Sequence, residues 1–496
     1  MVPLPPGASG SEMTESVSEG SAASALNTYD EVPYVGHPFD NTHPDRLATI
    51  AKLYGIDAAA VPSCRMLEIG CGDGANILPM AATLPAAEFV GCDLAAHPVA
   101  RAQQMASGLG LRNVRVMQLD FRDMPADMGS FDYIVVHGLY SWIPLEVRQR
   151  LLPVIARHLA PNGVALVSYN VFPGCRLRQA SWDLLKFHTR DLPDLKSKLA
   201  AARSLFAVMG NAGGPDAEAN PLRDEIRDMA DRPDGGLCHD DLSEANNPVY
   251  FHEFVADAAG SGLAFLAESS LSTMAAGGYA PDMHDALARM DRLTREQYLD
   301  FLSFRRFRSS LLCHAGALTG TELLPASVDS MHASPTLKTR NPEARASTPL
   351  PDLAEVRAIQ ELLFARWPRT VPVAEIAATL PTASMPVNLL LLELYIRNIV
   401  DLRTRPVAAA PVAGDRPSIF APARLICGDC DIVPNLFHEG IHLGDTIARR
   451  LVAMLDGTRT RAEIMSALGE VCAGPTGGEQ LERALGMLAQ KAMLVA

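Results

Sequence analysis

The segment RMLEIGCGDGAN, residues 65–76, constrains the fold of this chain more than any other. The short apolar run at 65–69 indicates a strand, and three closely spaced glycines separate it from an apolar stretch that indicates a helix. Glycine permits a tight turn and lets the backbone approach a ligand closely. This order of strand, turn and helix predicts an α/β sheet with a ligand at the turn.

Strands and helices continue to alternate up to about residue 174. The sequence predicts a helix at 44–54, further helices between the strands, and strands at 65–69, 88–93, 114–119, 133–137 and 164–170. A helix begins near Pro144 and contains Pro153, where we expect a kink. The alternation predicts a Rossmann-like parallel sheet that is covered on both faces.

Two ligand classes compete for the turn. Gly70, Gly72 and Ala75 match the spacing of a dinucleotide-binding turn. Glu68 and the glycines at 70, 72 and 74 match the E-x-G-x-G-x-G turn of class I methyltransferases. An acidic side chain ahead of the turn suits the cationic groups of S-adenosylmethionine, whereas a pyrophosphate gains nothing from it. A purely structural turn and a nicotinamide or flavin enzyme remain as alternatives.

Acidic residues also end the second and third predicted strands. Asp93, followed by Leu94, can accept both ribose hydroxyls, and this suits either nucleoside. Asp120 suits contact with an adenine, on which Phe121 is able to stack. The dinucleotide alternative does not require Asp120, so this residue favours S-adenosylmethionine.

Several longer segments resemble methyltransferases that carry a methyltransferase regulatory domain. The resemblance covers nearly everything from about Asn27 onward, including the C-terminal stretch LDGTRTRAEIMSAL. The other segments that carry it are YDEVPYVGHPFDNTHPDRLATIA, LEIGCGDGAN, FDYIVVHGLYSWIP, SYNVFPG, NPVYFHEFVADAAGSGLAFLAES and EQYLDFLSFRRFRSSLLCH.

The resemblance implies a class I methyltransferase fold with S-adenosylmethionine as cofactor. The family includes bacterial lysine methyltransferases that modify outer-membrane proteins, so it also implies protein lysine as the methyl acceptor. Tyr29 and Tyr34 are expected in a segment that folds over the cofactor, and no chemistry is assigned to the Cys71 thiol. The expected cofactor-binding residues are Tyr29, Tyr34, Glu68, Gly70, Cys71, Gly72, Gly74, Asp93, Leu94, Asp120, Phe121 and His137.

Polar and aromatic residues at the ends of the fourth and fifth strands are candidates for catalysis. A lysine acceptor has to lose its proton although its free pKa is about 10.4, so the site must desolvate the amine or offer a route for the proton. Aromatic faces stabilise cations, and His137 can serve as a base for a hydroxyl acceptor. Structural roles for His137, Tyr140 and Trp142 stay open. The candidates are His137, Tyr140, Trp142, Tyr169 and Asn170.

The net charge of the chain and the absence of one motif limit the class of molecule that can accept the methyl group. The chain has 43 Lys and Arg against 57 Asp and Glu, a formal net charge of −14, which disfavours a phosphate backbone. The fourth strand is not followed by the (D/N)-P-P-(Y/F) sequence that commonly holds the amino group of a base. Nucleic acid is therefore disfavoured. A small-molecule N- or O-methyltransferase and a non-enzymatic S-adenosylmethionine sensor or scaffold remain as alternatives to protein-lysine methylation.

The nine cysteines are irregularly spaced, which is typical of reduced thiols in a cytoplasmic protein. The start of the sequence does not match a secretory signal, and no apolar run reaches about 18 residues. We therefore expect a cytoplasmic protein with no membrane span.

We expect the chain to have five parts. The first three are a disordered tail at 1–26, a cofactor-binding domain at 27–211 and a regulatory middle region at 212–329, which includes a strand near 263 able to extend the sheet. A linker at 330–350 and a mostly helical domain at 351–496 follow.

The C-terminal domain has three helical stretches followed by IVDLRTRP, an order compatible with a winged-helix module. Its third helix is too apolar to contact bases, which favours packing or homodimerisation. Capping boxes at Thr294–Gln297 and Thr460–Glu463 predict helix starts, the first for a helix over 296–312. The arginines at 305, 306 and 308 then form a contact for an anionic patch or, as is more common for such a run, lie on a solvated helix face.

Cys427, Cys430, His438 and His442 have the spacing C-x2-C-x7-H-x3-H. A zinc finger has about twelve residues between its second cysteine and first histidine, so the gap here is short. We therefore expect buried thiols and surface histidines at these positions, and no metal site.

Overall fold

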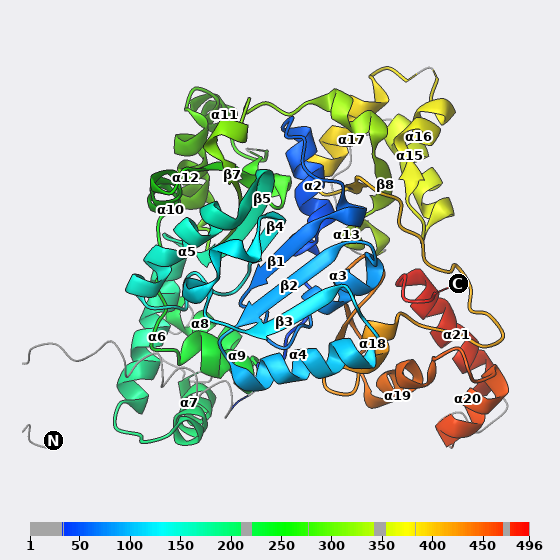
Figure 1. The fold of residues 1–496 in the computed structure, drawn as a ribbon, viewed down its shortest axis with the longest axis horizontal. Helices are drawn as coiled ribbons and strands as arrows, with labels where there is room; N and C mark the ends of the chain where they lie inside the picture. The colour runs from blue at the N-terminus through cyan, green and yellow to red at the C-terminus, as the bar shows by residue number, and fades with distance from the viewer. Residues whose placement is uncertain are drawn as a thin grey trace, which may run out of the picture.

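The structure, a computed structural model, describes residues 32, 34–209, 221–275, 277–341, 354–381, 383–469 and 477–495. A seven-stranded sheet lies at its centre, with the helices of the middle region on one side and the C-terminal helices on the other (Figure 1). The strands, in the spatial order β3-β2-β1-β4-β5-β7-β6, are β1 Arg65–Ile69, β2 Glu88–Asp93, β3 Val114–Gln118, β4 Phe131–Val136, β5 Leu159–Asn170, β6 Leu263–Glu268 and β7 Phe307–His314.

The predicted α/β class is confirmed. Strands β1 to β5 are parallel to one another, whereas β7 runs antiparallel to both β5 and β6. The parallel strands are apolar along most of their length because both faces of the sheet are covered. One face packs against α2 (Pro44–Leu53), α3 (Ile77–Thr83) and α4 (Ala96–Gly108), and the other against α5 (Leu145–His158) and α10 (Phe251–Gly260).

The first five strands lie where the sequence predicts them, and β5 begins earlier, at Leu159, because Leu159 pairs with Phe131 across a register shift. After β5 come α6 (Cys175–Thr189), α7 (Leu195–Met209), α8 (Pro221–Ala230) and the short α9 (Asp234–Gly236). The strand expected near residue 263 is present as β6.

The helix predicted over 296–312 is wrong in its second half. Helix α12 (Arg292–Ser303), which follows α11 (Pro281–Ala288), ends where Phe304 adopts a left-handed φ of 50°. The next residues form β7, which hydrogen-bonds to strands on both sides. The start of the helix was also placed wrongly. Its N-cap is Asp291, whose carboxylate accepts hydrogen bonds from the backbone of Leu293 and Thr294.

Arg308 does not lie on a solvated helix face. It is 1% exposed on β7, and its guanidinium contacts the carboxylates of Glu268 at 2.6 Å, Asp300 at 2.8 Å and Glu296 at 3.2 Å. Burial raises the pKa of both Asp300 and Glu296 despite the neighbouring guanidinium. Removing a buried charge partner leaves its counter-charges uncompensated, so Arg308 holds β6, β7 and α12 together.

The expected linker at 330–350 begins with structure. Residues His332–Pro335 form β8, which pairs with β10 (Val400–Arg403) and β9 (Val371–Pro372). The linker prediction is wrong there because β8 is the central strand of this small sheet, while residues 342–350 lie outside the described ranges. The helices of this part are α13 (Leu337–Arg340), α15 (Ala354–Arg366), α16 (Val373–Thr379) and α17 (Val387–Ile396).

The apolar helix α17 is packed inside the molecule. Its residues Leu390, Leu391 and Leu394 are buried in the same hydrophobic cluster as α2. Ion pairs join α2 to the adjoining strand, because Arg46 lies 3.0 Å from Asp401 in β10. No helix among the described residues is both long and apolar enough to cross a membrane.

The last segment of the chain packs against α3 and α4. It contains α18 (Ala421–Ile426), β11 (Ile432–Pro434), β12 (Gly440–His442), α19 (Thr446–Met454), α20 (Arg461–Leu468) and α21 (Gly477–Gln490). Figure 1 shows α18 next to α3, and Ala82 and Met105 pack against the hydrophobic cluster of this segment. The capping box Thr460–Glu463 is confirmed at the start of α20.

We expect Arg308→Leu to lower the free energy of unfolding by about 3–5 kcal/mol, because three buried carboxylates lose their shared cation. Urea unfolding followed by circular dichroism measures the change. Arg397→Leu is the control, since its pair with Glu393 is half-exposed and such surface pairs contribute about 0–1 kcal/mol. Equal stability of the two variants would contradict the role given to Arg308.

Candidate functional site

The glycine-rich turn lies between β1 and α3, at the carboxyl end of β1. Gly70, Gly72 and Gly74 have φ values of 78°, 52° and 79°, which other residues rarely adopt. A Cβ at Gly72 would meet no heavy atom within 4 Å, so the backbone there faces open space. A Cβ at Gly74 would lie 3.0 Å from that of Ala102, so this glycine lets the turn pack on α4.

Asp93 ends β2 directly beside the turn. One of its carboxylate oxygens accepts a hydrogen bond from the backbone N–H of Gly72 and the other from that of Ala95, both at 2.9 Å. A carboxylate has about four lone-pair sites, so both oxygens keep capacity for further donors such as ribose hydroxyls. Partial burial raises the pKa of Asp93.

Glu68 lies beneath the turn and is 3% exposed. Its Oε1 accepts a hydrogen bond of 2.7 Å from Asn76 Nδ2, whereas its Oε2 is buried and has no partner among the described residues. Burial raises the pKa of Glu68 to about 8. An unpartnered buried carboxylate oxygen is costly unless a ligand satisfies it. Glu68, the open face at Gly72 and the carboxylate of Asp93 together fit a cationic nucleoside such as S-adenosylmethionine.

Residues 34–42 cross over the turn. Phe39 donates its backbone N–H to Asn76 Oδ1 at 3.0 Å, and a Cβ at Gly36 would lie 2.5 Å from Asp73 Oδ1. Tyr34 is 40% exposed, and its ring lies 5.9 Å from that of His239 in the middle region. Tyr29 lies outside the described residues. The structure therefore places the segment after Tyr34, rather than Tyr34 itself, against the turn.

An aromatic cluster surrounds His137, just after β4. Its ring centroid lies 4.0 Å from that of Phe39 and 6.0 Å from that of Phe307, and the ring of His37 lies tilted beside that of Phe39, with 4.3 Å between centroids. Burial lowers the pKa of His137 to about 4, and its Nδ1 is buried with no partner in the described part of the chain. Sequence reasoning missed the other three residues of this cluster, because Phe307 lay in a predicted helix and His37 and Phe39 belong to no strand end.

Tyr140 and Tyr169 belong to the hydrophobic core beneath α5 and α10. Tyr169 stacks on Phe254 with 4.0 Å between ring centroids, and Tyr140 meets the same ring edge-on at 5.3 Å. Tyr169 also shares a hydrogen bond of 2.9 Å with Ser310 Oγ. Their side chains are 1% and 0% exposed, an arrangement that favours the packing alternative for both.

The two remaining catalytic candidates lie near the ends of β4 and β5. Asn170 donates from Nδ2 to Asn246 Oδ1 at 3.1 Å and is register-paired with Phe307 of the His137 cluster. Trp142 is half-buried, and its Nε1 has no hydrogen-bond partner among the described residues. Asn170 is thus brought close to His137 by the sheet.

The cofactor candidates at the edge of the turn have differing environments. Asp120 accepts hydrogen bonds from the backbone and the guanidinium of Arg122, the latter at 2.6 Å, and Phe121 is buried in the core. Leu94 is 39% exposed and offers apolar surface next to Asp93. Cys71 is buried beneath the turn against β2. Arg122, which sequence reasoning did not single out, therefore occupies most of the acceptor capacity of Asp120.

The cysteines and histidines of the zinc-finger-like spacing have separate partners. Cys427 lies 3.1 Å from the carbonyl of Arg424, and Cys430 accepts from the backbone of Ile432. His442 is exposed beside Asp431, whereas His438 is 2% exposed, so the surface prediction is wrong for His438. Within the described ranges, no group of three or more His, Cys, Asp or Glu side chains is arranged to hold a metal.

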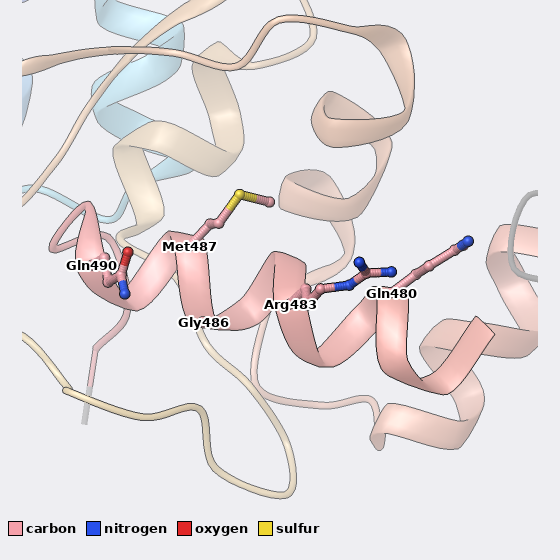
Figure 2. Close-up of a pocket in the computed structure, with 5 residues that line it drawn as sticks. All are labelled: Gln480, Arg483, Gly486, Met487 and Gln490. Carbon is pink, nitrogen blue, oxygen red and sulfur yellow. The ribbon is translucent and has the colours of Figure 1, made fainter. Parts of the chain in front are cut away.

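A shallow depression lies on the C-terminal helix α21. It is lined by Gln480, Arg483, Gly486, Met487 and Gln490, all of which come from this one helix (Figure 2). Figure 1 shows α21 at the edge of the molecule, outside the sheet. We therefore place the candidate site at the glycine-rich turn and the adjoining ends of β2 and β4.

Two protein families match the parts of this chain that contain the glycine-rich turn and the middle region. The family described as "Methyltransferase domain" matches residues 66–163, and the "Predicted methyltransferase regulatory domain" matches residues 233–314. The uncharacterised protein RP789 of Rickettsia prowazekii is 37% identical over 293 residues, which cover 58% of this chain and 53% of that protein. The chain thus matches about half the length of that relative. RP028 of the same organism is 34% identical over 230 residues, covering 46% of this chain and 92% of RP028.

Solved structures share the fold over nearly the whole chain. PKMT2 from Rickettsia typhi superposes with a TM-score of 0.78 at 24% identity, covering 93% of this chain and 100% of that one. A second structure of PKMT2, in complex with AdoHcy, gives the same TM-score and identity and covers 94% of this chain. The likeness includes the C-terminal segments as well as the sheet.

We expect Asp93→Ala to weaken the binding of S-adenosylmethionine by about 1.5–3 kcal/mol, the range for hydrogen bonds to a charged group. Isothermal titration calorimetry measures the change. Asp123→Ala is the matched control, because Asp123 is an exposed carboxylate in the loop after β3. An unchanged dissociation constant for Asp93→Ala would refute its contact with the ribose.

Proposed function

We propose that this chain, which belongs to the S-adenosylmethionine-dependent methyltransferases that carry a methyltransferase regulatory domain, methylates the side-chain amine of protein lysine. The observation that carries the proposal is the neutral, buried His137 among aromatic rings, next to the turn. When bound, S-adenosylmethionine supplies a methyl group on a positively charged sulfur.

The His137 cluster suits an amine that must be neutral to react. A lysine amine gives up its proton more readily where it is desolvated, and a neutral imidazole adds no positive charge beside the sulfonium. The faces of Phe39 and Phe307 stabilise the cationic product amine. Phe307 is 40% exposed and connects this cluster to the surface. In-line alignment of the amine with the methyl group then supplies the main rate enhancement.

The choice of a protein acceptor rests on two further observations. The net charge of −14 favours the approach of a cationic partner over that of a polyanion. The sequence resembles bacterial lysine methyltransferases, and the fold is similar to that of PKMT2 over nearly the whole chain. The charge argues against nucleic acid, and the resemblance supports lysine as the acceptor over a small molecule.

The acceptor is tested with tritiated S-adenosylmethionine. The purified protein is incubated with a bacterial outer-membrane protein fraction and, separately, with a metabolite extract. We expect label on lysine side chains of the protein fraction, located by mass spectrometry, and less label with Asp93→Ala at a cofactor concentration that does not saturate this variant. Label in metabolites alone would replace the proposal with a small-molecule methyltransferase. Cofactor binding without transfer to either pool would favour the sensor alternative.

The neutral state of His137 predicts how activity depends on pH. Because burial lowers the pKa of His137 to about 4, its imidazole is already neutral and does not titrate between pH 6 and pH 9. Activity should rise with pH as the acceptor amine loses its proton, with no inflection near the ordinary histidine value of about 6.5. We therefore expect His137→Gln to lower the rate and leave the shape of the profile unchanged.

The pH profiles of kcat/KM for the wild type and His137→Gln are compared with that of His442→Gln, whose histidine is exposed. A step near pH 6.5 that is present in the wild type and lost only in His137→Gln would show that His137 is a titrating base, contrary to this mechanism.

A further inference from the structure

Four segments of the chain meet at the side chain of Asn76, the last residue before α3. Its Nδ2 donates to Glu68, while its Oδ1 accepts from the backbone of Phe39 at 3.0 Å and from His438 Nε2 at 2.9 Å. Thr42 Oγ1 lies 3.1 Å from the same oxygen, but the carbonyl of Phe39 is a nearer acceptor for its single proton, at 2.7 Å. Two N–H donors converge on this oxygen, which can only accept, so the amide nitrogen has to face Glu68. The orientation of Glu68 thus depends on the groups that hold Asn76.

His438 reaches this site from the opposite end of the sequence. It lies in the connection between β11 and β12 and has a φ of 64°. Such a conformation is uncommon for a residue other than glycine, and it persists where the surrounding structure enforces it. A glycine would satisfy the backbone at lower cost. Because histidine occupies this position despite the strain, we infer that its side chain makes an interaction that a glycine could not make.

The turn that carries His438 is held rigidly. The side-chain oxygen of Asn435 accepts hydrogen bonds of 2.9 Å from the backbones of both Phe437 and Glu439. The carboxylate of Glu439 in turn contacts Asn435 Nδ2 at 2.7 Å and the guanidinium of Arg340. The imidazole is therefore presented to Asn76 by a turn that is fixed on both sides.

The same hairpin covers the N-terminal segment over the glycine-rich turn. A Cβ at Gly440 would lie 3.6 Å from the carbonyl oxygen of Pro38, so residues 36–42 run between the turn and the hairpin. Arg101 of α4 makes a second link, at 2.8 Å from Asp429 and 3.7 Å from Asp73. The C-terminal segment thus contacts the glycine-rich turn at two independent points.

We propose that His438 is a positioning residue for the cofactor, which acts through Asn76 to aim the free oxygen of Glu68 at the cationic part of S-adenosylmethionine. The inference rests on the proposed cofactor contact of Glu68 and extends the cofactor site to the C-terminal segment. Burial lowers the pKa of His438 to about 3, so its ring is neutral. Because the Oδ1 of Asn76 can only accept, the Nε2–H tautomer is the one that fits this contact.

The test uses the full-length protein and measures the dissociation constant of S-adenosylmethionine by calorimetry. Loss of one aligning hydrogen bond in His438→Ala is expected to weaken binding about tenfold. His438→Gln keeps an N–H donor and is expected to restore most of the affinity. His442→Ala, on the same hairpin but exposed, is the control and should bind as the wild type does.

A Glu68→Gln background separates positioning from a general structural role. If His438 acts through Glu68, His438→Ala should cause no further loss of affinity once Glu68 is replaced. A thermal melt confirms that each variant is folded. If His438→Ala is not folded, His438→Gly takes its place, because glycine tolerates the positive φ.

Two results would overturn the inference: a folded His438→Ala or His438→Gly protein with wild-type affinity, or an equal loss of affinity in the Glu68 and Glu68→Gln backgrounds. A wild-type protein that binds no S-adenosylmethionine would instead overturn the cofactor assignment itself, so the two failures are distinguishable.

Discussion

The amide of Asn76 is the contact on which the arrangement of the site depends. It joins the first strand, the N-terminal segment, the glycine-rich turn and the C-terminal hairpin through hydrogen bonds to Glu68, Phe39 and His438, all of them at least partly buried. Buried polar networks of this kind are costly when a member is unsatisfied and specify one geometry when all are satisfied. A single side chain thus relates segments that are hundreds of residues apart.

The site also keeps several ionisable groups in their neutral forms. Burial raises the pKa of Glu68 to about 8 and lowers those of His137 and His438 to about 4 and about 3. Together these groups leave little fixed charge around the place where a sulfonium is expected. A cation that enters such a site meets carboxylates whose ionisation it favours, so ligand and protein charge are mutually dependent.

Local sequence patterns were sufficient to predict the parts of the fold that depend on local order. The first five strands, Glu68 and Asp93 follow from apolar runs that end in a glycine or an acidic residue. The pattern failed at β7, where the arginines suggest a solvated helix although Arg308 is neutralised by three carboxylates from β6 and α12. Burial of a charge depends on partners that no local window contains.

The same limit applies to the site. Tyr140 and Tyr169 were chosen for their place at strand ends, but their contacts with Phe254 are set by a helix that packs later in the chain. Phe39 and Phe307 reach His137 through the N-terminal segment and an antiparallel strand, neither of which the periodicity places. His438 looked like a surface residue because its partner, Asn76, is 362 positions away.

That separation bears on how such proteins diverge. A substitution at position 76 that removes the acceptor oxygen leaves His438 with a strained backbone and without its hydrogen bond to residue 76. A glycine at position 438 removes one of the hydrogen bonds that hold the amide of Asn76, so the amide can rotate away. The two positions are therefore expected to covary among relatives, and a comparison confined to the catalytic core would miss one member of the pair.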